Sequence, residues 1–490
     1  MNKYPNRAIL IWVALGLLAY VLLPWYAYAD APWYATWHQI FAASDTASGL
    51  LQATSHSRVW LMIGALGLIA AGATYFMRPG RNQGAVLIAS AGAGSLGVVG
   101  AGFLIGSKGW RFDWMNSSFG ELAINQLGMG IGAFVALVAL VVLFAFGIAR
   151  RGMFRGDLFV AASVLCCAAL LVVFIAYPVS KTLQAAFVTE EGVLSVSAFF
   201  SRLGNDRTWG LGCLSGNVSC GVAWNTLFLA LLTATSTTIL GTMMALMAER
   251  AAGPKLQTPL RVLAMLPIIT PPFVVGLGLI LLFGRAGLAN QFLEWAFGIP
   301  PTRWFYGLFG IWLAQTFAFT PIAFMIMRGV VQGVAPSLEE AAQTLRADRS
   351  KTFFTITLPL LKPGLANAFL VGFIESIADF GNPIVVGGSY SVLSTDIFFA
   401  IVGAQYDQGK AASLAWILTL FALAVFAIQR GLLGKQNYTT VTGKGDSGLP
   451  IPLSDGVRRT VKCFVCPWLA FTVIIYVFAF IGGFVQTWGR

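Results

Sequence analysis

The sequence predicts an all-α protein that crosses a membrane about eleven times. Charged residues make up 10% of its 490 residues and hydrophobic residues 57%, whereas a soluble domain carries roughly 25% charged residues. Apolar stretches of about 20 residues recur along the chain, each long enough to cross a hydrocarbon core of about 30 Å as a helix. The alternating pattern that marks the strands of an outer-membrane barrel is absent.

The distribution of Lys and Arg predicts how these spans are oriented. We expect spans at about 8–28, 58–77, 84–106, 126–149, 157–178, 223–248, 262–284, 305–328, 364–388, 411–431 and 463–485. With the N-terminus in the cytoplasm, cytoplasmic segments hold 21 of the 31 Lys and Arg residues. Cytoplasmic loops carry such an excess. The net charge of +12 therefore indicates membrane topology rather than a nucleic-acid partner.

Loop length and composition divide the chain into four regions. Residues 1–156 hold four spans with short loops and many Gly and Ala residues, which let helices pack closely in lipid; we interpret them as an accessory region. Residues 157–432 hold six spans with longer connections. Residues 433–462 form a polar linker rich in Gly, Pro, Ser and Thr. Residues 463–490 add one more span.

Few residues suggest bond-making chemistry. The chain lacks a paired-histidine site, a nucleophile elbow and a phosphate loop, so no catalytic or metal-binding residue is assigned and no cofactor is expected on this chain. Any ATP hydrolysis must come from a separate chain. Cys213 and Cys220 lie in an expected external loop, where a disulfide is plausible.

Prolines interrupt the seventh expected span at Pro267, Pro271 and Pro272. A proline frees backbone carbonyls within the membrane, and these need partners from neighbouring helices or a cavity. A helix broken near the middle of the membrane often lines a transport pathway, and a simple kink is the alternative.

A charged stretch, residues 339–361, stands between two apolar spans on the expected cytoplasmic side. It contains strong helix formers, and acidic residues in its first turn suit the helix dipole. Ser337 is predicted to cap the helix, with Glu340 completing a capping box, and Pro359 to end it. Ala341, Ala342 and Leu345 are expected to form a small apolar patch. Small residues on one face and charge on the other suit docking into a groove of a partner, and an ordinary solvated loop is the alternative.

The spacing within this stretch resembles a motif of the permease subunits of ATP-binding-cassette (ABC) importers. That motif reads Glu-Ala-Ala, three residues, Gly, nine residues, then Ile-x-Leu-Pro. The corresponding residues here are Glu340, Ala341, Ala342, Arg346, Ile356, Leu358 and Pro359. One position departs from the family: Arg346 stands where the glycine permits a turn between two short helices, so Arg346 is expected either to continue one helix or to adopt a strained turn.

The resemblance extends over about 157–432 and implies the six-helix core of a type I ABC importer, with the Glu-Ala-Ala (EAA) loop at 336–362. Residues 375–415 and 438–450 are similar to the ferric-iron permease group. In that group two six-span modules are commonly fused in one chain. This chain would then match the first module, the linker and the opening span of the second.

Partners follow from the same resemblance. It implies a bacterial inner-membrane protein that works with two copies of an ATP-binding subunit, which uses the ATP. It also implies an external substrate-binding protein and a second permease module, from the same kind of chain or another. Glu340 would contact the ATP-binding subunit, and Ala341 and Ala342 would allow close approach. The surrounding lipid bilayer completes the assembly.

Two carboxylates lie in the span that follows the loop. Glu375 and Asp379 are four residues apart, so they share one helix face, and a carboxylate within a membrane is a functional candidate by default. Ferric iron prefers oxygen ligands, so these residues, with Asn382, are candidates for the iron pathway. In the alternative, Asp379 caps a break near Gly381 and Glu375 bonds to a neighbouring helix.

The EAA loop itself leaves the cargo open. Permeases for polyamine, thiamine, phosphonate or sulfate share the loop, so the expectation of iron depends on 375–415 and the linker alone. A secondary transporter that needs no ATPase is an alternative from a different class, and the EAA loop argues against it.

Overall fold

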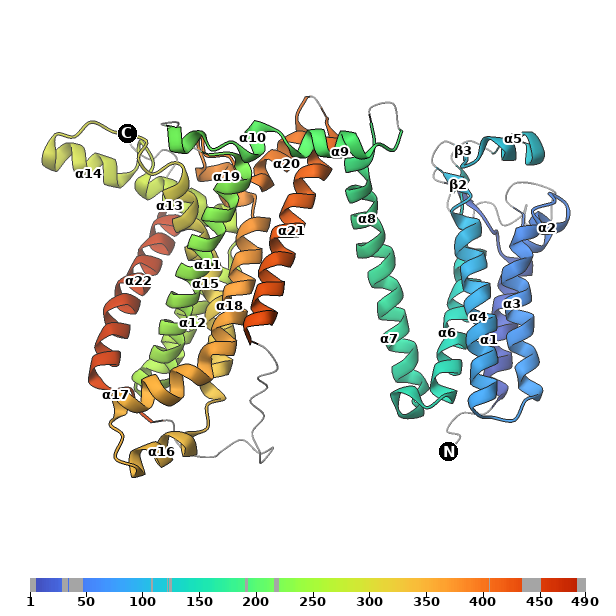
Figure 1. Ribbon diagram of the computed structural model, residues 1–490, viewed down its shortest axis with the longest axis horizontal. Helices are drawn as coiled ribbons and strands as arrows, with labels where there is room; N and C mark the ends of the chain where they lie inside the picture. The colour runs from blue at the N-terminus through green and yellow to red at the C-terminus, as the bar shows by residue number, and fades with distance from the viewer. Residues whose placement is uncertain are drawn as a thin grey trace. The chain divides into compact units, whose positions relative to one another are not determined.

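The computed structural model describes residues 6–28, 34, 47–106, 109–120, 122, 126–189, 193–215, 220–404, 406–433 and 451–482. Contacts divide the chain into two units, Met1–Pro178 and Val179–Arg490 (Figure 1). The prediction of an all-α protein is confirmed, because the strands among the described residues are four pieces of two residues each. Ten helices in the described part of the chain are long and apolar enough to cross a membrane. The first expected span falls short of that length, since α1 (Arg7–Leu22) has 16 residues.

The first unit is a bundle of long apolar helices with short elements at one end. Its elements are α1, β1 (Ala27–Tyr28), α2 (Gly49–Thr54), α3 (Met62–Ala73), α4 (Arg81–Gly102), β2 (Ile105–Gly106), β3 (Gly109–Trp110), α5 (Asp113–Phe119), β4 (Gln126–Leu127), α6 (Ile131–Arg150) and α7 (Leu158–Leu171). β1 pairs with β4 and β2 with β3, both antiparallel. The unit reaches Pro178 because α7 packs on α6 through Ala145, Ala149 and Ala161.

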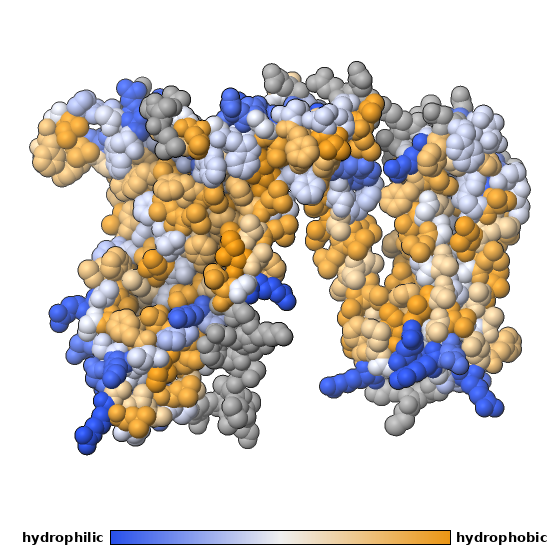
Figure 2. Space-filling view, viewed as in Figure 1, coloured by the Kyte–Doolittle hydropathy of each residue, from blue (hydrophilic) through white to orange (hydrophobic). Residues whose placement is uncertain are grey.

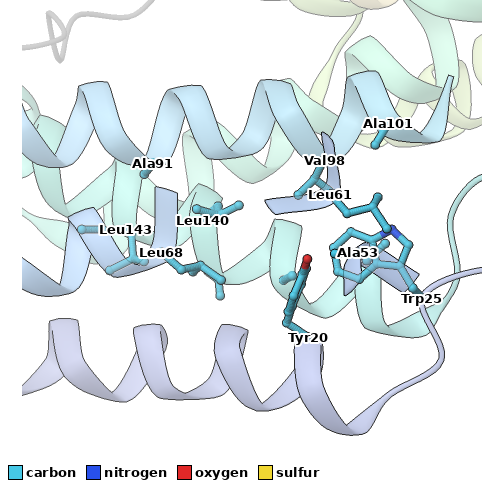
Figure 3. Packing of buried hydrophobic residues seen from close by; sticks show 14 of the residues in the cluster. Tyr20, Trp25, Ala53, Leu61, Leu68, Ala91, Val98, Ala101, Leu140 and Leu143 are labelled. Atoms are coloured by element: carbon cyan, nitrogen blue, oxygen red, sulfur yellow. The ribbon is translucent and has the colours of Figure 1, made fainter. Parts of the chain in front are cut away.

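Small residues bring the helices of this unit close together. A Cβ atom added at Gly67 of α3 would lie 2.6 Å from the Cα atom of Gly94 on α4. Leu68 of α3 and Leu140 and Leu143 of α6 belong to the apolar core of this unit (Figure 3). The crossing of α3 and α4 therefore depends on the Gly-rich composition of α4, as expected for helices that associate in lipid.

A buried arginine holds the strand-bearing end of this bundle. The Arg58 guanidinium lies 5.0 Å from the ring centroid of Tyr26 and 5.2 Å from that of Trp110, and it donates to Gln52 Oε1 at 2.9 Å. Cation–π contacts of this kind strengthen when water is excluded.

The second unit contains the spans that surround the EAA loop. Its elements are α8 (Tyr177–Gln184), which begins in the first unit, α9 (Val196–Leu203), α10 (Asp206–Trp209), α11 (Val222–Leu246), α12 (Pro254–Ile269), α13 (Pro272–Phe283), α14 (Leu288–Phe297), α15 (Leu308–Gln332), α16 (Pro336–Thr344), α17 (Arg349–Thr352), α18 (Leu358–Ala378), α19 (Gly381–Val386), α20 (Leu393–Val402), α21 (Gln408–Leu433) and α22 (Asp455–Gly482). α11 packs against both α15 and α18 in the centre of the unit, and α22 lies along α11, α12 and α13. Figure 2 shows apolar side chains over the sides of the long helices and hydrophilic ones gathered at their ends.

Among the described residues of the second unit, two segments are wound as π-helix, with hydrogen bonds five residues apart. Met247–Ala251 extends α11, and Phe353–Thr357 joins α17 to α18. Such wide turns are rare and recur at functional sites. Both lie at the end of the unit that carries α16 (Figure 1).

The seventh expected span is broken in the structure. α12 ends at Ile269 and α13 begins at Pro272, because Pro271 and Pro272 cannot supply the backbone N–H groups that a continuous helix needs. The Thr270 hydroxyl lies within hydrogen-bond distance of the Pro267 carbonyl, at 3.1 Å, and of the Tyr476 hydroxyl on α22, at 2.8 Å.

Candidate functional site

The EAA loop projects beyond the ends of α11, α15 and α18 (Figure 1). Its first helix, α16, begins at Pro336 with Ala335 as the N-cap residue. Proline suits this position because the first helical N–H has no partner within the helix. The prediction of Ser337 as the cap is therefore wrong, since Ser337 already lies in the first turn.

The second half of the loop continues directly into the long helix α18. α17, the π-helical turn and α18 follow one another directly, with Ile356 in the turn and Leu358 as the first residue of α18. Pro359 is the second residue of α18. The prediction that Pro359 ends a helix is thus wrong, because proline is tolerated in the first turn of the helix it begins.

A left-handed residue joins the two halves. Arg346 has φ +63°, in the region that favours glycine. The Ala347 amide donates to the Ala342 carbonyl at 3.0 Å, as in a Schellman turn, and the Asp348 carboxylate accepts from the Lys351 amide at 3.0 Å and caps α17. Of the two predicted possibilities, a continued helix or a strained turn, the structure has the turn.

Adjacent glutamates on α16 have opposite surroundings. Glu340 is exposed, whereas Glu339 is buried and its Oε1 lies 2.5 Å from Arg250 Nη1. Both side chains of this pair are 2% exposed. The Thr357 hydroxyl donates to the same carboxylate oxygen. The buried Glu339 carboxylate therefore ties α16 to the π-helical turn at the end of α11, by an ion pair, and to the one that leads into α18, by a hydrogen bond.

The outer face of α16 is apolar and open to solvent. Leu338, Ala341 and Leu345 are exposed, Leu345 by 84%, and their spacing places them on one side of the helix. Ala342 turns inward and is buried. The expected apolar patch of Ala341, Ala342 and Leu345 is thus divided between two faces, and Leu338 takes the place of Ala342 on the open one.

A second carboxylate joins helices just above the loop. Glu249 accepts from Arg261 Nη2 at 2.7 Å, from Arg328 Nε at 2.9 Å and from Gln332 Nε2 at 2.9 Å. The end of α11, the middle of α12 and the end of α15 are therefore joined by charge-assisted hydrogen bonds, which are stronger than neutral ones.

The predicted pathway residues lie in a polar cluster at the opposite end of α18. Asp379 Oδ2 accepts from Gln315 Nε2 at 3.0 Å and from Asn382 Nδ2 at 2.9 Å. Its Oδ1 accepts from the amides of Gly381 and Asn382, at 3.0 and 3.3 Å. Asp379 thus caps α19 and binds α15 at once.

Glu375 and Asn382 retain unused oxygen atoms in this cluster. Among the described residues, no hydrogen bond or ion pair to the Glu375 carboxylate is present, and Asn382 Oδ1 is buried without a partner. Ser376 and Thr233 donate to Gln315 Oε1, at 2.7 and 3.0 Å, which fixes the amide that faces Asp379. The free oxygen atoms are of the kind that a hard cation prefers as ligands. Asp379 also has the capping position that the alternative interpretation predicts.

A disulfide joins Cys213 and Cys220 at the end of the unit away from α16, with Cα atoms 4.7 Å apart. Cys220 lies beside Gly221, which precedes α11. Within the described residues, no group of three or more His, Cys, Asp or Glu side chains could hold a metal ion.

Comparisons with known proteins identify the family of the chain. The family described as "Binding-protein-dependent transport system inner membrane component" matches residues 237–435. The molybdenum transport system permease protein ModB of Mycobacterium bovis is 32% identical over 204 residues, which are 41% of this chain and 75% of ModB. The chain belongs to this family of binding-protein-dependent inner-membrane permeases.

Two longer permeases share more of the chain. The putative ferric transport system permease protein FbpB 1 of Haemophilus influenzae is 38% identical over 373 residues, 76% of this chain and 57% of that protein. The ferric transport system permease protein FbpB of Actinobacillus pleuropneumoniae is 37% identical over 374 residues, 76% of this chain and 52% of that protein. The chain thus spans little more than half the length of these relatives. The predicted resemblance to the ferric permease group is confirmed.

The structure adds three residues to the permease site that the sequence did not indicate. Arg250, Glu339 and Thr357 form the buried link, and Arg250 is 89 residues away from Glu339 in the chain. In the sequence, only the acidic pair Glu339 and Glu340 indicated a functional position here, and the motif pointed to Glu340, which is the exposed one.

Proposed function

We propose that this chain is the inner-membrane permease of an ATP-driven, binding-protein-dependent importer of ferric iron. The observation that carries the proposal is the EAA loop, with an apolar face open to solvent and a buried ion pair that anchors it to the spans. The names of the two FbpB relatives support ferric iron as the cargo.

In this mechanism two ATP-binding subunits dock in the cytoplasm, and each receives one α16-type helix. Leu338, Ala341 and Leu345 would enter an apolar groove, and Glu340 would contact a polar group at its rim. The anchored base of α16 would carry the motion of the ATP-binding subunits to α11 and α18. ATP binding and a loaded binding protein would each bias the permease between outward and inward access.

The ferric ion would pass the cluster at the opposite end of α18. Glu375 and Asn382 supply oxygen ligands, which suit a hard cation, and Asp379 contributes negative charge while its side chain holds α19. The second half of the pathway would come from a second permease module, in line with the greater length of the FbpB relatives.

The test is uptake of radioactive ferric iron by cells that express this chain with its ATP-binding subunit, its binding protein and a second module. Each component is omitted in turn, and labelled molybdate is offered in parallel. Iron uptake that needs every component supports the proposal. Uptake of molybdate alone would reassign the cargo, and uptake without the ATP-binding subunit would point to a secondary transporter.

A further inference from the structure

The segment that precedes α22 packs against the buried ion pair of the EAA loop. Ile451, Pro452 and Leu453 line a small hollow together with residues of the turn that extends α11 and of the loop, namely Arg250, Glu339, Arg349, Thr352, Phe353 and Thr357. Leu453 is 5% exposed and belongs to the same apolar cluster as Phe353. Residues 451–453 are called the latch below.

The latch shields an ion pair whose hydrogen-bonding capacity is only partly used. Among the described residues, Arg250 Nε, Arg250 Nη2 and Glu339 Oε2 are buried without a hydrogen-bond partner. Burial strengthens the attraction between the two charges, but each unpaired polar atom lowers the stability of the arrangement. The geometry of the pair is therefore sensitive to what covers it, and the latch is part of that cover.

The latch leads directly into a long helix. α22 begins at Asp455, and its Val461, Val465 and Leu469 lie in the same apolar cluster as Leu453. α22 then runs along α11, α12 and α13. A displacement of α17 or of the π-helical turn would press on the latch and reach α22 without passing through α15 or α18.

We propose that the latch is a second route by which motion of the EAA loop reaches the membrane helices. Movement of the loop would change the packing of Leu453 and shift the start of α22. The EAA loop of the first module would then act directly on the segment that leads into the second module. This inference rests on the proposed function, because it takes the EAA loop to be the part moved by the ATP-binding subunit.

Leu453→Ala and Leu453→Asp test the latch, with Leu432→Ala and Leu432→Asp as matched controls. Leu432 lies at the other end of the linker and is 82% exposed. The first measurement is amide hydrogen exchange of the full chain in detergent. We expect Leu453→Ala to raise exchange in 336–345 and 455–461 by about tenfold, because local opening becomes easier, and Leu432→Ala to leave both segments unchanged.

The second measurement is ATP hydrolysed per ferric ion imported by the assembled transporter. If Leu453 only stabilised the fold, its loss would lower hydrolysis and uptake together and leave their ratio constant. We expect the Leu453 variants to raise the ratio several-fold and the Leu432 variants to match the parent protein. If Leu453→Asp does not fold, Leu453→Ala decides the question.

Failure of the latch and failure of the proposed function give different results. A parent protein that imports iron, with a Leu453 variant equal to the Leu432 control in both measurements, overturns the latch alone. A parent protein that imports no iron with all components present contradicts the proposed function, while the exchange measurement still reports on the contact between the latch and the loop.

Discussion

Arg250 Nη1 lies 2.5 Å from Glu339 Oε1, and both side chains are 2% exposed. The pair joins α16 to the π-helical turn that extends α11. The helix that carries the family motif is therefore held by an ionic contact rather than by its exposed apolar face. That face, with Leu338 and Leu345, stays free for a partner.

Breaking this ion pair should destabilise the protein strongly. Removal of one partner leaves an uncompensated buried charge, which costs roughly 3–5 kcal/mol of unfolding free energy. Glu339→Gln and Arg250→Met are each expected to fall in this range, measured by unfolding in detergent. Arg250→Met combined with Glu339→Leu should recover most of the loss, since no lone charge remains. A double variant as unstable as the sum of the single ones would contradict this explanation.

Glu340 should behave in the opposite way. Its side chain is exposed, so Glu340→Ala should change the unfolding free energy by less than about 1 kcal/mol. The same variant should uncouple transport, because the proposed contact with the ATP-binding subunit is lost. The measurement is iron uptake at matched amounts of folded protein, and normal uptake would remove Glu340 from the contact.

Arg346→Gly should stabilise the EAA loop. A side chain in the left-handed region costs roughly 1–2 kcal/mol, and glycine avoids that cost but is more flexible when unfolded. We expect a net gain of about 1 kcal/mol in the free energy of unfolding. Gly298 offers the reverse experiment, since it has φ +65° and open space around its Cα. Gly298→Ala should lose about as much as Arg346→Gly gains.

Asp379→Asn tests the negative charge of Asp379 separately from the hydrogen bonds with which its side chain caps α19. Asparagine retains one oxygen for the amides of Gly381 and Asn382, but its NH₂ group would face the donors of Gln315 and Asn382. We expect a loss of about 1–3 kcal/mol in unfolding free energy and lower iron uptake, with binding of the ATP-binding subunit unchanged. Glu375→Gln is the control without a capping role. Unchanged uptake in both variants would exclude these carboxylates from the pathway.

The contact between Gly67 and Gly94 should tolerate no side chain. Gly67→Ala places a methyl group 2.6 Å from the Gly94 Cα atom, and overpacking of this kind costs about 1–3 kcal/mol. Gly100 lies on the same α4 with nothing within 4 Å of an added Cβ. Gly100→Ala should therefore be neutral or stabilising, by up to about 1 kcal/mol. Thermal unfolding of the two variants side by side distinguishes crowding from a general effect of removing glycine.

Sequence patterns located the spans and the EAA loop because both have short-range signals. Hydropathy marks a span by its length, and the motif spacing identified Arg346 as a turn position, where the structure has φ +63°. No short-range signal indicated which of Glu339 and Glu340 is buried. Neighbouring residues on a helix point about 100° apart, and which one turns inward depends on Arg250, which lies far away in the chain.

The role of Asp379 was ambiguous for a related reason. A carboxylate four residues after another predicts a shared helix face, but α18 ends at Ala378 and Asp379 adopts an extended conformation. Its partners come from α15 and α19. Local spacing identified the cluster as polar, and only the packing of three helices showed how the side chain is held.

Each of the two π-helical turns beside the buried ion pair absorbs one extra residue. Arg250 lies inside Met247–Ala251, and Thr357 closes Phe353–Thr357, so each partner of Glu339 follows or occupies a stretch that carries one residue more than an α-helix needs. Deleting a single residue from either stretch would restore regular winding and leave the following helix in phase, because the wide turn only absorbs that extra residue. A one-residue deletion here would thus disturb the partners of Glu339 while the helices on both sides keep their packing, whereas the same deletion in a regular turn of α11 or α18 would rotate every following side chain by about 100°.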